Sequence, residues 1–425
     1  MKRVYLVVMV LLSFQVVFSQ AYAVDVDCTS KSLQSAIYDA SSGDVLNVTG
    51  TCNESITITK NDLTIIGNNA VISGSALPFP MNLLTVDGAK RVYISGFKIE
   101  YGLFGMSIVN GASVHVSNTN IVDNIIGINV NGNAQIKLRD VDITDNGPHK
   151  MAVGLEVNDN SVVQVAGTVS ISGCDAFGFD ILVSSILSLE EERDHSLPGA
   201  ALNSFDNLLG GQISVNSSFF ARDRATVNVY NNGALGFSVN TGSTAMLFNA
   251  TLKSHDNGLD GVDIVSAGNF ELDGHSSIMS MNNGREGISV DDSTINLFGF
   301  FSTKKGLPEL VVKGNAKDGI QLETGSLLDI GRNASVVSMN NGQAGLSLDD
   351  GSRAILQRAV MQNNAGDLRP NNRDEDNADI IATFGSRITF RMNPDNSGNT
   401  TANKVGLALC DASSMARGDV KCRKG

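Results

Sequence analysis

The stretch Asn257-Gly-Leu-Asp-Gly-Val-Asp-Ile264 is repeated three times in the residues that follow it, as Asn283-Gly-Arg-Glu-Gly-Ile-Ser-Val290, Asn315-Ala-Lys-Asp-Gly-Ile-Gln-Leu322 and Asn341-Gly-Gln-Ala-Gly-Leu-Ser-Leu348. In each copy an asparagine stands four residues before a glycine, and the glycine opens a triplet of an apolar, a variable and an apolar residue. A unit that returns at intervals of this length indicates a solenoid built from stacked coils.

The glycine-led triplet extends well beyond these four copies. It begins at Gly105, Gly127, Gly154, Gly178, Gly236, Gly261, Gly287, Gly319 and Gly345. The one long gap, between Gly178 and Gly236, is divided by Ile213-Ser-Val-Asn, and weaker copies follow at Asp379-Ile-Ile and Gly406-Leu-Ala-Leu. The sequence therefore predicts a single solenoid domain of about 12 coils.

Each triplet alternates apolar and polar residues, and a second short run of the same kind follows, as in Ser113-Val-His-Val and Ser293-Thr-Ile-Asn-Leu. Runs this short with a period of two are typical of β-strands. Gly, Asn, Asp and Ser fill the positions between them, where turns are expected. Such units bury their apolar faces only by stacking in parallel, about 4.8 Å apart, so we predict an all-β parallel β-helix.

The asparagine before each glycine recurs in five consecutive coils. The positions are Asn232, Asn257, Asn283, Asn315 and Asn341. Side-chain amides stacked at one corner can hydrogen-bond along the coils and to the turn backbone. We therefore interpret these residues as a structural ladder.

The residues before the repeat carry a resemblance to a known family. A short amphipathic segment, 32–40, precedes Gly43-Asp-Val-Leu-Asn-Val, Ser55-Ile-Thr-Ile-Thr and Asp62-Leu-Thr-Ile-Ile-Gly67. This order resembles the opening of right-handed parallel β-helix proteins of the pectin-lyase-like superfamily. The resemblance implies a cap helix and a right-handed coil. Members of the superfamily include polysaccharide lyases, hydrolases, epimerases and proteins without known activity, so function has to be argued from a site.

The N-terminal residues 1–23 have the pattern of a cleaved secretory signal. Lys2 and Arg3 precede an apolar run, and Ala21 and Ala23 are small residues at the positions that a signal peptidase reads. We expect a secreted or periplasmic protein that begins at Val24 and comprises one domain, 24–425. The mature net charge would be about −15, against −13 for the whole chain.

Export lets cysteines pair, and four of the five lie near the two ends of the solenoid. We predict the disulfides Cys28–Cys52 and Cys410–Cys422, the second within a C-terminal cap, 403–425. Each closes a short loop, and the end coils of a solenoid have only one neighbour to stabilise them. Cys174 is left over and is expected to be a small buried thiol.

One pair of adjacent acids marks the candidate catalytic site. The middle residue of each triplet should point outward, and among these residues only Glu156 and Asp180 are acids on neighbouring coils. Two such carboxyls can share a proton, a cation or a sugar. His149 and Lys150 precede this coil, and an expected insertion, 189–209, follows it. The competing interpretation is an ordinary solvated face.

A second group of acids follows the triplets of three later coils: Asp291, Asp292, Glu323, Asp349 and Asp350. Stacked carboxylates repel one another unless they are hydrated or bridged, and Ca²⁺ accepts six to eight oxygens. The group is thus a candidate Ca²⁺ site or a row of hydrated turn acids.

Incomplete catalytic signatures and the acidic composition narrow the range of possible functions. The catalytic signatures of polygalacturonases and pectate lyases are incomplete, as in Leu368-Arg-Pro-Asn-Asn-Arg373. An acidic chain repels polyuronates, gives no basic stripe for nucleic acid and has no later apolar stretch long enough to span a membrane. We expect a protein that binds or processes an extracellular polysaccharide on its outward strand face. The alternative is a non-catalytic surface, matrix or adhesion protein.

Overall fold

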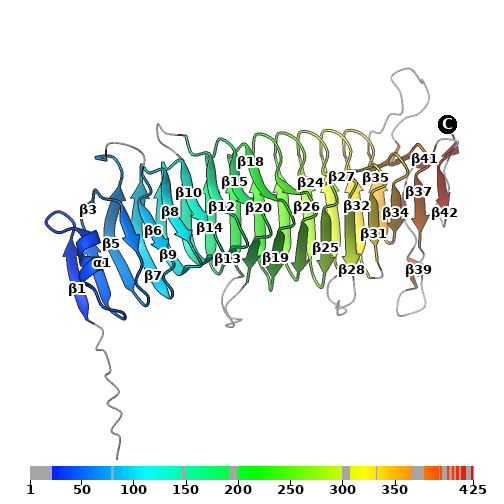
Figure 1. Cartoon of the computed structure of the whole chain (residues 1–425). Coiled ribbons are helices and arrows are strands. Elements are labelled where there is room, and N and C mark those ends of the chain that lie inside the picture. The colour runs from blue at the N-terminus through cyan, green and yellow to red at the C-terminus, as the bar shows by residue number, and fades with distance from the viewer. Residues whose placement is uncertain are drawn as a thin grey trace, which may run out of the picture.

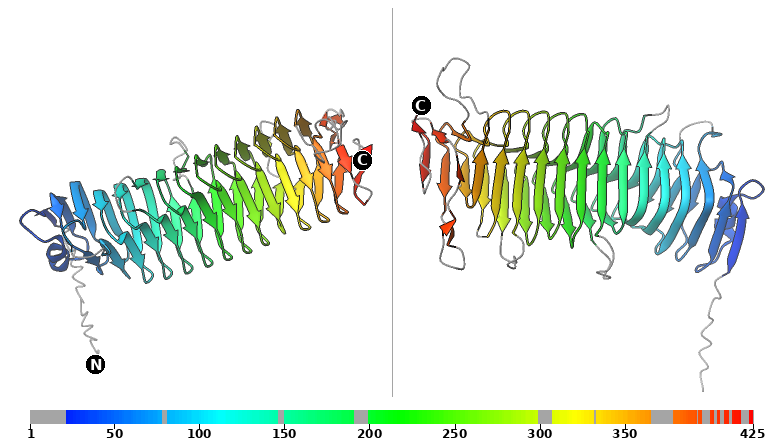
Figure 2. Two further views of the ribbon diagram at one scale, coloured as in Figure 1. Left: turned by 90° about the horizontal axis from the view of Figure 1, so that it is seen from above. Right: turned by 180° about the vertical axis from the view of Figure 1, so that it is seen from behind.

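The computed structural model shows a long right-handed solenoid of about 13 turns with one short helix near its N-terminal end (Figure 1). It describes residues 22–77, 81–145, 150–190, 199–298, 307–331, 333–364 and 378–391, and beyond these 393–394, 400–401, 404–405, 408–410, 413–417 and 423–424. The predicted parallel β-helix is confirmed. Figure 2 shows that the coils stack along one axis from the N-terminal cap to the C-terminal end.

Strands from successive coils form a parallel sheet with 15 strands in the described residues. Its members are β4 (Ile56–Ile58), β6 (Leu84–Asp87), β8 (Phe104–Val109), β10 (Ile126–Val130), β12 (Val153–Val157), β15 (Phe177–Ile181), β18 (Leu209–Ile213), β21 (Phe237–Val239), β24 (Val262–Val265), β27 (Ile288–Asp291), β30 (Ile320–Glu323), β33 (Leu346–Leu348), β36 (Ile380–Ala382), β41 (Ala408–Cys410) and β43 (Arg423–Lys424). These strands contain the glycine-led triplets.

The remaining faces of the solenoid form one continuous sheet of 26 described strands, because β5, β7, β9 and β11 bend from one face to the next. Its members are β1 (Ala23–Asp27), β2 (Val45–Thr49), β3 (Thr51–Cys52), β5 (Thr64–Ser73), β7 (Val92–Glu100), β9 (Ser113–Val122), β11 (Gln135–Thr144), β13 (Val162–Val165), β14 (Thr168–Ser172), β16 (Ile186–Leu189), β17 (Ala201–Phe205), β19 (Ser218–Arg222), β20 (Thr226–Tyr230), β22 (Thr244–Phe248), β23 (Thr251–His255), β25 (Asn269–Asp273), β26 (Ser277–Met281), β28 (Thr294–Phe298), β29 (Glu309–Lys313), β31 (Leu327–Ile330), β32 (Ser335–Met339), β34 (Arg353–Leu356), β35 (Ala359–Gln362), β37 (Arg387–Phe390), β40 (Lys404–Val405) and β42 (Met415–Arg417). Two short antiparallel strands, β38 (Asn393–Pro394) and β39 (Thr400–Thr401), lie outside it.

On all faces, apolar and polar residues alternate along the strands. The apolar side chains point into one core that runs along the solenoid axis. Phe179, Phe219, Phe237 and Phe270 are fully buried, and the ring of Phe237 contacts the other three, with ring centroids 5.2 to 6.0 Å apart. This burial of large apolar side chains in every coil is the main stabilising contribution to the stack.

The five asparagines predicted to form a ladder lie buried inside one corner. In each, the side-chain Nδ2 donates to Oδ1 of the asparagine in the next coil, at 2.9 to 3.0 Å, and the same Oδ1 accepts from the backbone N–H of the previous one. The row extends beyond the prediction, to Asn207, Asn364 and Asp379. Buried polar groups of the corner are thereby paired.

Cys174 occupies the ladder position one coil before Asn207. Its backbone N–H donates to Asn207 Oδ1 at 2.9 Å, and its side chain is a free, buried thiol. Burial raises the pKa of this thiol to about 12. The thiol is therefore protonated at neutral pH, as expected for a structural cysteine.

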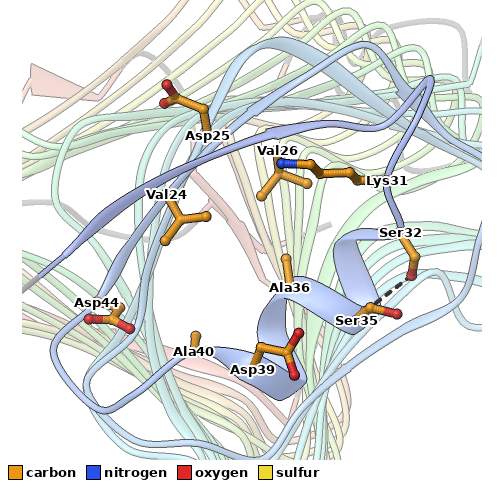
Figure 3. Close-up of a pocket in the computed structure, with 10 residues that line it drawn as sticks. All are labelled: Val24, Asp25, Val26, Lys31, Ser32, Ser35, Ala36, Asp39, Ala40 and Asp44. Atoms are coloured by element: carbon orange, nitrogen blue, oxygen red, sulfur yellow. Dashed lines mark hydrogen bonds between the residues drawn. The ribbon is translucent and has the colours of Figure 1, made fainter.

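The N-terminal end is closed by helix α1 (Leu33–Asp39), whose N-cap Ser32 accepts from the backbone N–H of Ser35 at 3.1 Å. The predicted Cys28–Cys52 disulfide is present. Cys410 is also disulfide-bonded, and its predicted partner Cys422 lies outside the described residues. A cavity of about 400 Å³ lies between β1 and α1 at this end of the solenoid. Figure 3 shows residues that line it.

The expected insertion at 189–209 is shorter than predicted. Ala201–Phe205 forms strand β17, which pairs in register with β14 and β20, because Leu202 and Ser204 alternate inward with the rest of the coil. Residues 191–198 lie outside the described part of the chain. At the C-terminal end, β41 and β43 extend the 15-stranded sheet through the segment predicted as a cap. Within the described residues, no helix has the length and apolar character needed to cross a membrane.

Candidate functional site on the 15-stranded sheet

The outward side chains at the middle of the 15-stranded sheet form one polar row along the axis. Consecutive strands pair in register at these positions, so the side chains stack at the spacing of the coils. The row comprises Thr57, Thr85, Ser107, Asn129, Glu156, Asp180, Gln212, Ser238, Asp263, Ser289, Gln321 and Ser347. We call this set the polar row.

One member of the polar row differs from the sequence prediction, which placed Ser214 after Asp180. The structure places Gln212 there, paired with Asp180 and with Ser238. The triplet Gly211-Gln-Ile213 does not fit the repeat pattern, because Gly211 stands where an apolar residue was expected. The ring of Phe179 fills that space: a Cβ on Gly211 would lie 2.0 Å from its Cζ. The core position is therefore occupied from the neighbouring coil.

Glu156 and Asp180 lie on neighbouring strands, directly opposite each other in the register of β12 and β15. An amide flanks each carboxyl: Asn129 Nδ2 donates to Glu156 Oε2 at 3.1 Å, and Gln212 Nε2 donates to Asp180 Oδ1 at 3.2 Å. Asp180 is only 8% exposed. Its burial, with a smaller contribution from the Glu156 charge, raises its pKa to about 6 despite the Gln212 hydrogen bond.

This arrangement suits proton transfer. A carboxyl with a pKa near 6 exchanges a proton readily close to neutral pH, and the adjacent carboxylate disfavours its ionised form. The amides of Asn129 and Gln212 hold both carboxyls in place and can also bond a polar ligand.

Of the two predicted supporting residues, the structure describes only Lys150. Lys150 Nζ lies 3.4 Å from Asp175 Oδ1, and both side chains are largely exposed. Its ion pair is therefore with Asp175 at the corner before β15. His149 lies outside the described residues, as do Glu191, Glu192, Asp194 and His195 of the following insertion.

The acids predicted as a candidate Ca²⁺ site lie at the exit of later strands. Asp291 and Glu323 pair in register, and Asp349 N donates to Leu322 O, which continues the row. Asp292 and Asp350 have left-handed φ angles of 46° and 47°, which Asp tolerates, so they serve the turn. Among the described residues, no three of these carboxyls bring oxygen atoms within 4.8 Å of one another.

A third set of acids was missed. Asp260, Glu286 and Asp318 directly precede the glycines of three successive triplets, and all three are buried. The Glu286 backbone N–H donates to Asp260 Oδ1 at 3.0 Å, and Arg285 Nε and Lys317 Nζ lie 3.0 and 3.2 Å from Glu286 oxygens. An acid immediately before each glycine was the signal in the sequence.

Burial dominates the electrostatics of these acids. It raises the pKa of Asp260 to about 7, reinforced by the hydrogen bond to Glu286 and its charge. It raises the pKa of Asp318 to about 7 and that of Asp263 in the polar row to about 6. For Glu286, burial is outweighed by hydrogen bonds from Asp260 and Lys317, so its pKa is lowered. The later coils of this face thus carry several carboxyls that titrate near neutral pH.

No protein-family model matches the sequence, and no curated protein matches it significantly. Solved structures with the same kind of fold do match. An alginate lyase from Paenibacillus sp. str. FPU-7 is 17% identical, with a TM-score of 0.41 over 62% of this chain and 95% of that chain. A periplasmic alginate epimerase is 13% identical, with a TM-score of 0.35 over 87% and 84%. The pectate lyase Pel9A is 13% identical, with a TM-score of 0.34 over 84% and 82%.

These likenesses concern the fold and carry no argument about activity. The parallel register of the coils, the cap helix and the single solenoid core define a right-handed parallel β-helix. Function therefore has to be argued from a site on this structure.

Proposed function

We propose that the protein is exported and processes a polysaccharide that binds over Glu156, Asp180 and the members of the polar row that flank them. The observation that carries the proposal is the pair Glu156 and Asp180: two carboxyls side by side on an outward strand face, with Asp180 nearly buried and its pKa raised to about 6. Perturbed carboxyls beside hydrogen-bonding amides are typical of sites that bind and cleave sugars.

In this proposal Asp180 carries the proton and Glu156 is the charged partner. Asp180 in its protonated form would donate to a glycosidic or hydroxyl oxygen, and Glu156 would stabilise positive charge that develops on the sugar or accept a proton. Asn129 and Gln212 would bond sugar hydroxyls on either side. His149 and Lys150 remain candidates for a supporting proton carrier, and Ca²⁺ at the acids from Asp291 to Asp350 remains a candidate ligand.

The test is a screen of the mature protein against polysaccharides, followed by variants on the substrate that reacts. Asp180→Asn is expected to reduce kcat about 100-fold or more, because general acid–base catalysis contributes about 10²–10⁴-fold. The wild-type rate should depend on pH with an apparent pKa near 6. Glu156→Gln should lower kcat and shift that apparent pKa downward, because the neighbouring negative charge is gone.

Asp263 provides a matched control. It lies in the same polar row, and burial likewise raises its pKa to about 6, but it stands three strands away from Asp180. Asp263→Asn should leave kcat unchanged. Equal loss in the two variants, or full activity of Asp180→Asn, would exclude the assigned role of Asp180.

Export is part of the proposal, and the cleavage position gives its test. The disulfide-bonded Cys28–Cys52 pair is compatible with an oxidising compartment. Cleavage after Ala23 would remove only the first residue of β1, so the pairing of Val24 with Leu46 and of Val26 with Val48 would be kept. Mass spectrometry of the exported protein is expected to find Val24 as the first residue. Retention of residues 1–23 in exported protein would contradict the predicted signal.

A non-catalytic surface, matrix or adhesion protein is the alternative. It is supported by the continuous stack of coils, which makes a rigid rod suited to presenting a surface. Binding of a glycan without turnover, in a protein whose Asp180→Asn variant binds equally well, would favour this alternative.

A further inference from the structure

A row of apolar side chains lies on the outer surface beside the polar row. Phe104, Ile126, Val153, Phe177 and Leu209 stand in register at the start of five successive strands of the 15-stranded sheet. Leu235 continues the row in the next coil, where its carbonyl oxygen accepts from Gly210 N–H at 3.0 Å. All six side chains are partly exposed. We call this set the apolar row.

The glycine after each member is required because a side chain there would enter the packed interior of the coil. A Cβ built on Gly154 would point into the core, 2.2 Å from Ile171 Cγ2 and 3.3 Å from Cys174 Sγ. Val153 is partly exposed, whereas Leu155 and Val157 of the same strand are fully buried in the core, so the Val153 side chain lies outside the core. The apolar row is therefore not the edge of the core but a second, outward layer.

The apolar row ends abruptly. In the next three coils the equivalent positions are the buried acids Asp260, Glu286 and Asp318. A coil of this solenoid therefore does not require an apolar residue directly before the glycine. The large, partly exposed apolar side chains lie in the coils around Glu156 and Asp180, since Val153 and Phe177 belong to the same strands as these two acids.

A contiguous, partly exposed apolar strip beside a line of hydrogen-bonding groups fits the surface of a sugar chain. Sugar rings have apolar C–H faces and a polar rim of hydroxyls, and binding sites for them combine apolar surfaces with a few placed polar groups. Six coils at about 4.8 Å give a strip about 24 Å long. Several consecutive sugar units would lie along it.

The charge of this surface defines the class of sugar. Over these coils the polar row contributes Ser107, Asn129, Glu156, Asp180, Gln212 and Ser238, which include two acids and no base. The buried acids and Asp263 follow directly. These carboxylates would repel a polyuronate, whereas they would not repel an uncharged chain.

We propose that the apolar row is the binding platform for an uncharged linear polysaccharide, which lies parallel to the solenoid axis with its reacting unit over Glu156 and Asp180. This inference rests on the proposed function and adds the direction of the chain, the length of the contact and the class of sugar.

The experiment measures binding of neutral oligosaccharides of increasing length, and of uronate oligomers, to the mature protein by calorimetry. For the neutral sugar that binds, affinity should rise with length and level off at on the order of five units, where the strip is filled. Ile126→Gln and Leu209→Gln should each weaken binding about fivefold or more, because each removes roughly one apolar contact, about 1–2 kcal/mol. Both side chains are partly exposed, so the fold should persist, which the melting temperature checks.

Leu259→Gln is the matched control. Leu259 is 37% exposed at the corner before Asp260, beyond the end of the apolar row, so this change should not alter binding. Failure of every glycan to bind wild-type protein would reject the proposed function itself. Binding of a glycan that is unchanged in Ile126→Gln and Leu209→Gln would reject only the platform, and tight binding of uronates in place of neutral sugars would overturn the assigned class.

Discussion

Replacing Asn283 with alanine is expected to lower the free energy of unfolding by about 4 kcal/mol, because one buried N–H loses its partner, at about 1–3 kcal/mol, and further buried hydrogen bonds are lost, at about 0.5–1.5 kcal/mol each. Asn283 is 1% exposed in the middle of the ladder. Its Oδ1 accepts from both the backbone N–H and Nδ2 of Asn257, and its Nδ2 donates to Asn315. Alanine leaves the Asn257 backbone N–H without its partner in a site closed to water. It also removes one of the hydrogen bonds of Asn257 Nδ2 and one of those of Asn315 Oδ1, which keep their other partners.

The measurement is the guanidinium chloride midpoint, together with hydrogen exchange at the backbone N–H of Asn257. Exchange is needed because long repeat arrays can unfold in parts, and a local opening would escape a single global transition. Asn296→Ala is the control: Asn296 also lies between coils, but it is partly exposed and its contact with Asn269 is 3.5 Å long. Equal effects of the two changes would show that the ladder contributes no more than an ordinary surface amide.

Raising the pH from 5 to 8 is expected to destabilise the folded protein by about 3 kcal/mol or more, since each buried carboxyl that must ionise costs about 1–3 kcal/mol over this range. The groups responsible are Asp180, Asp260, Asp263 and Asp318, whose pKa values are raised to about 6 or 7 by burial. Acids with ordinary pKa values in the unfolded chain are already ionised at pH 5, so the folded state binds more protons there. Stability from these groups is complete at low pH and is lost as the pH rises through 6 and 7.

Melting temperatures across this pH range test the sign. Asp318→Asn should melt higher than wild type at pH 8 and show a flatter pH dependence, because the amide oxygen can still accept from Ala344 N–H while no charge is buried. Asp350→Asn is the control, at an exposed turn position whose left-handed backbone Asn also tolerates. A melting temperature that increases steadily toward pH 8 would show that the buried acids do not govern stability in this range.

The features that the sequence identified are those set by residues within one coil. Three features recur in the coils because each coil has the same local geometry. They are a glycine without room for a side chain, an asparagine four residues before it, and a triplet with a period of two. Once the repeat was aligned, the adjacency of Glu156 and Asp180 followed from register alone. The acids before Gly261, Gly287 and Gly319 could have been found by the same alignment.

The features that only the tertiary structure decided depend on contacts between coils. Gly211 breaks the triplet because the Phe179 ring from the neighbouring coil fills its place, so Gln212 rather than Ser214 stands beside Asp180. Lys150 pairs with Asp175 because of the path that the chain takes at the corner, and this path cannot be deduced from residue spacing. The raised pKa of Asp180 comes from burial by surrounding coils. Repeating local geometry made the fold readable from the sequence, whereas the chemistry of the site depends on which side chain fills the space between one coil and the next.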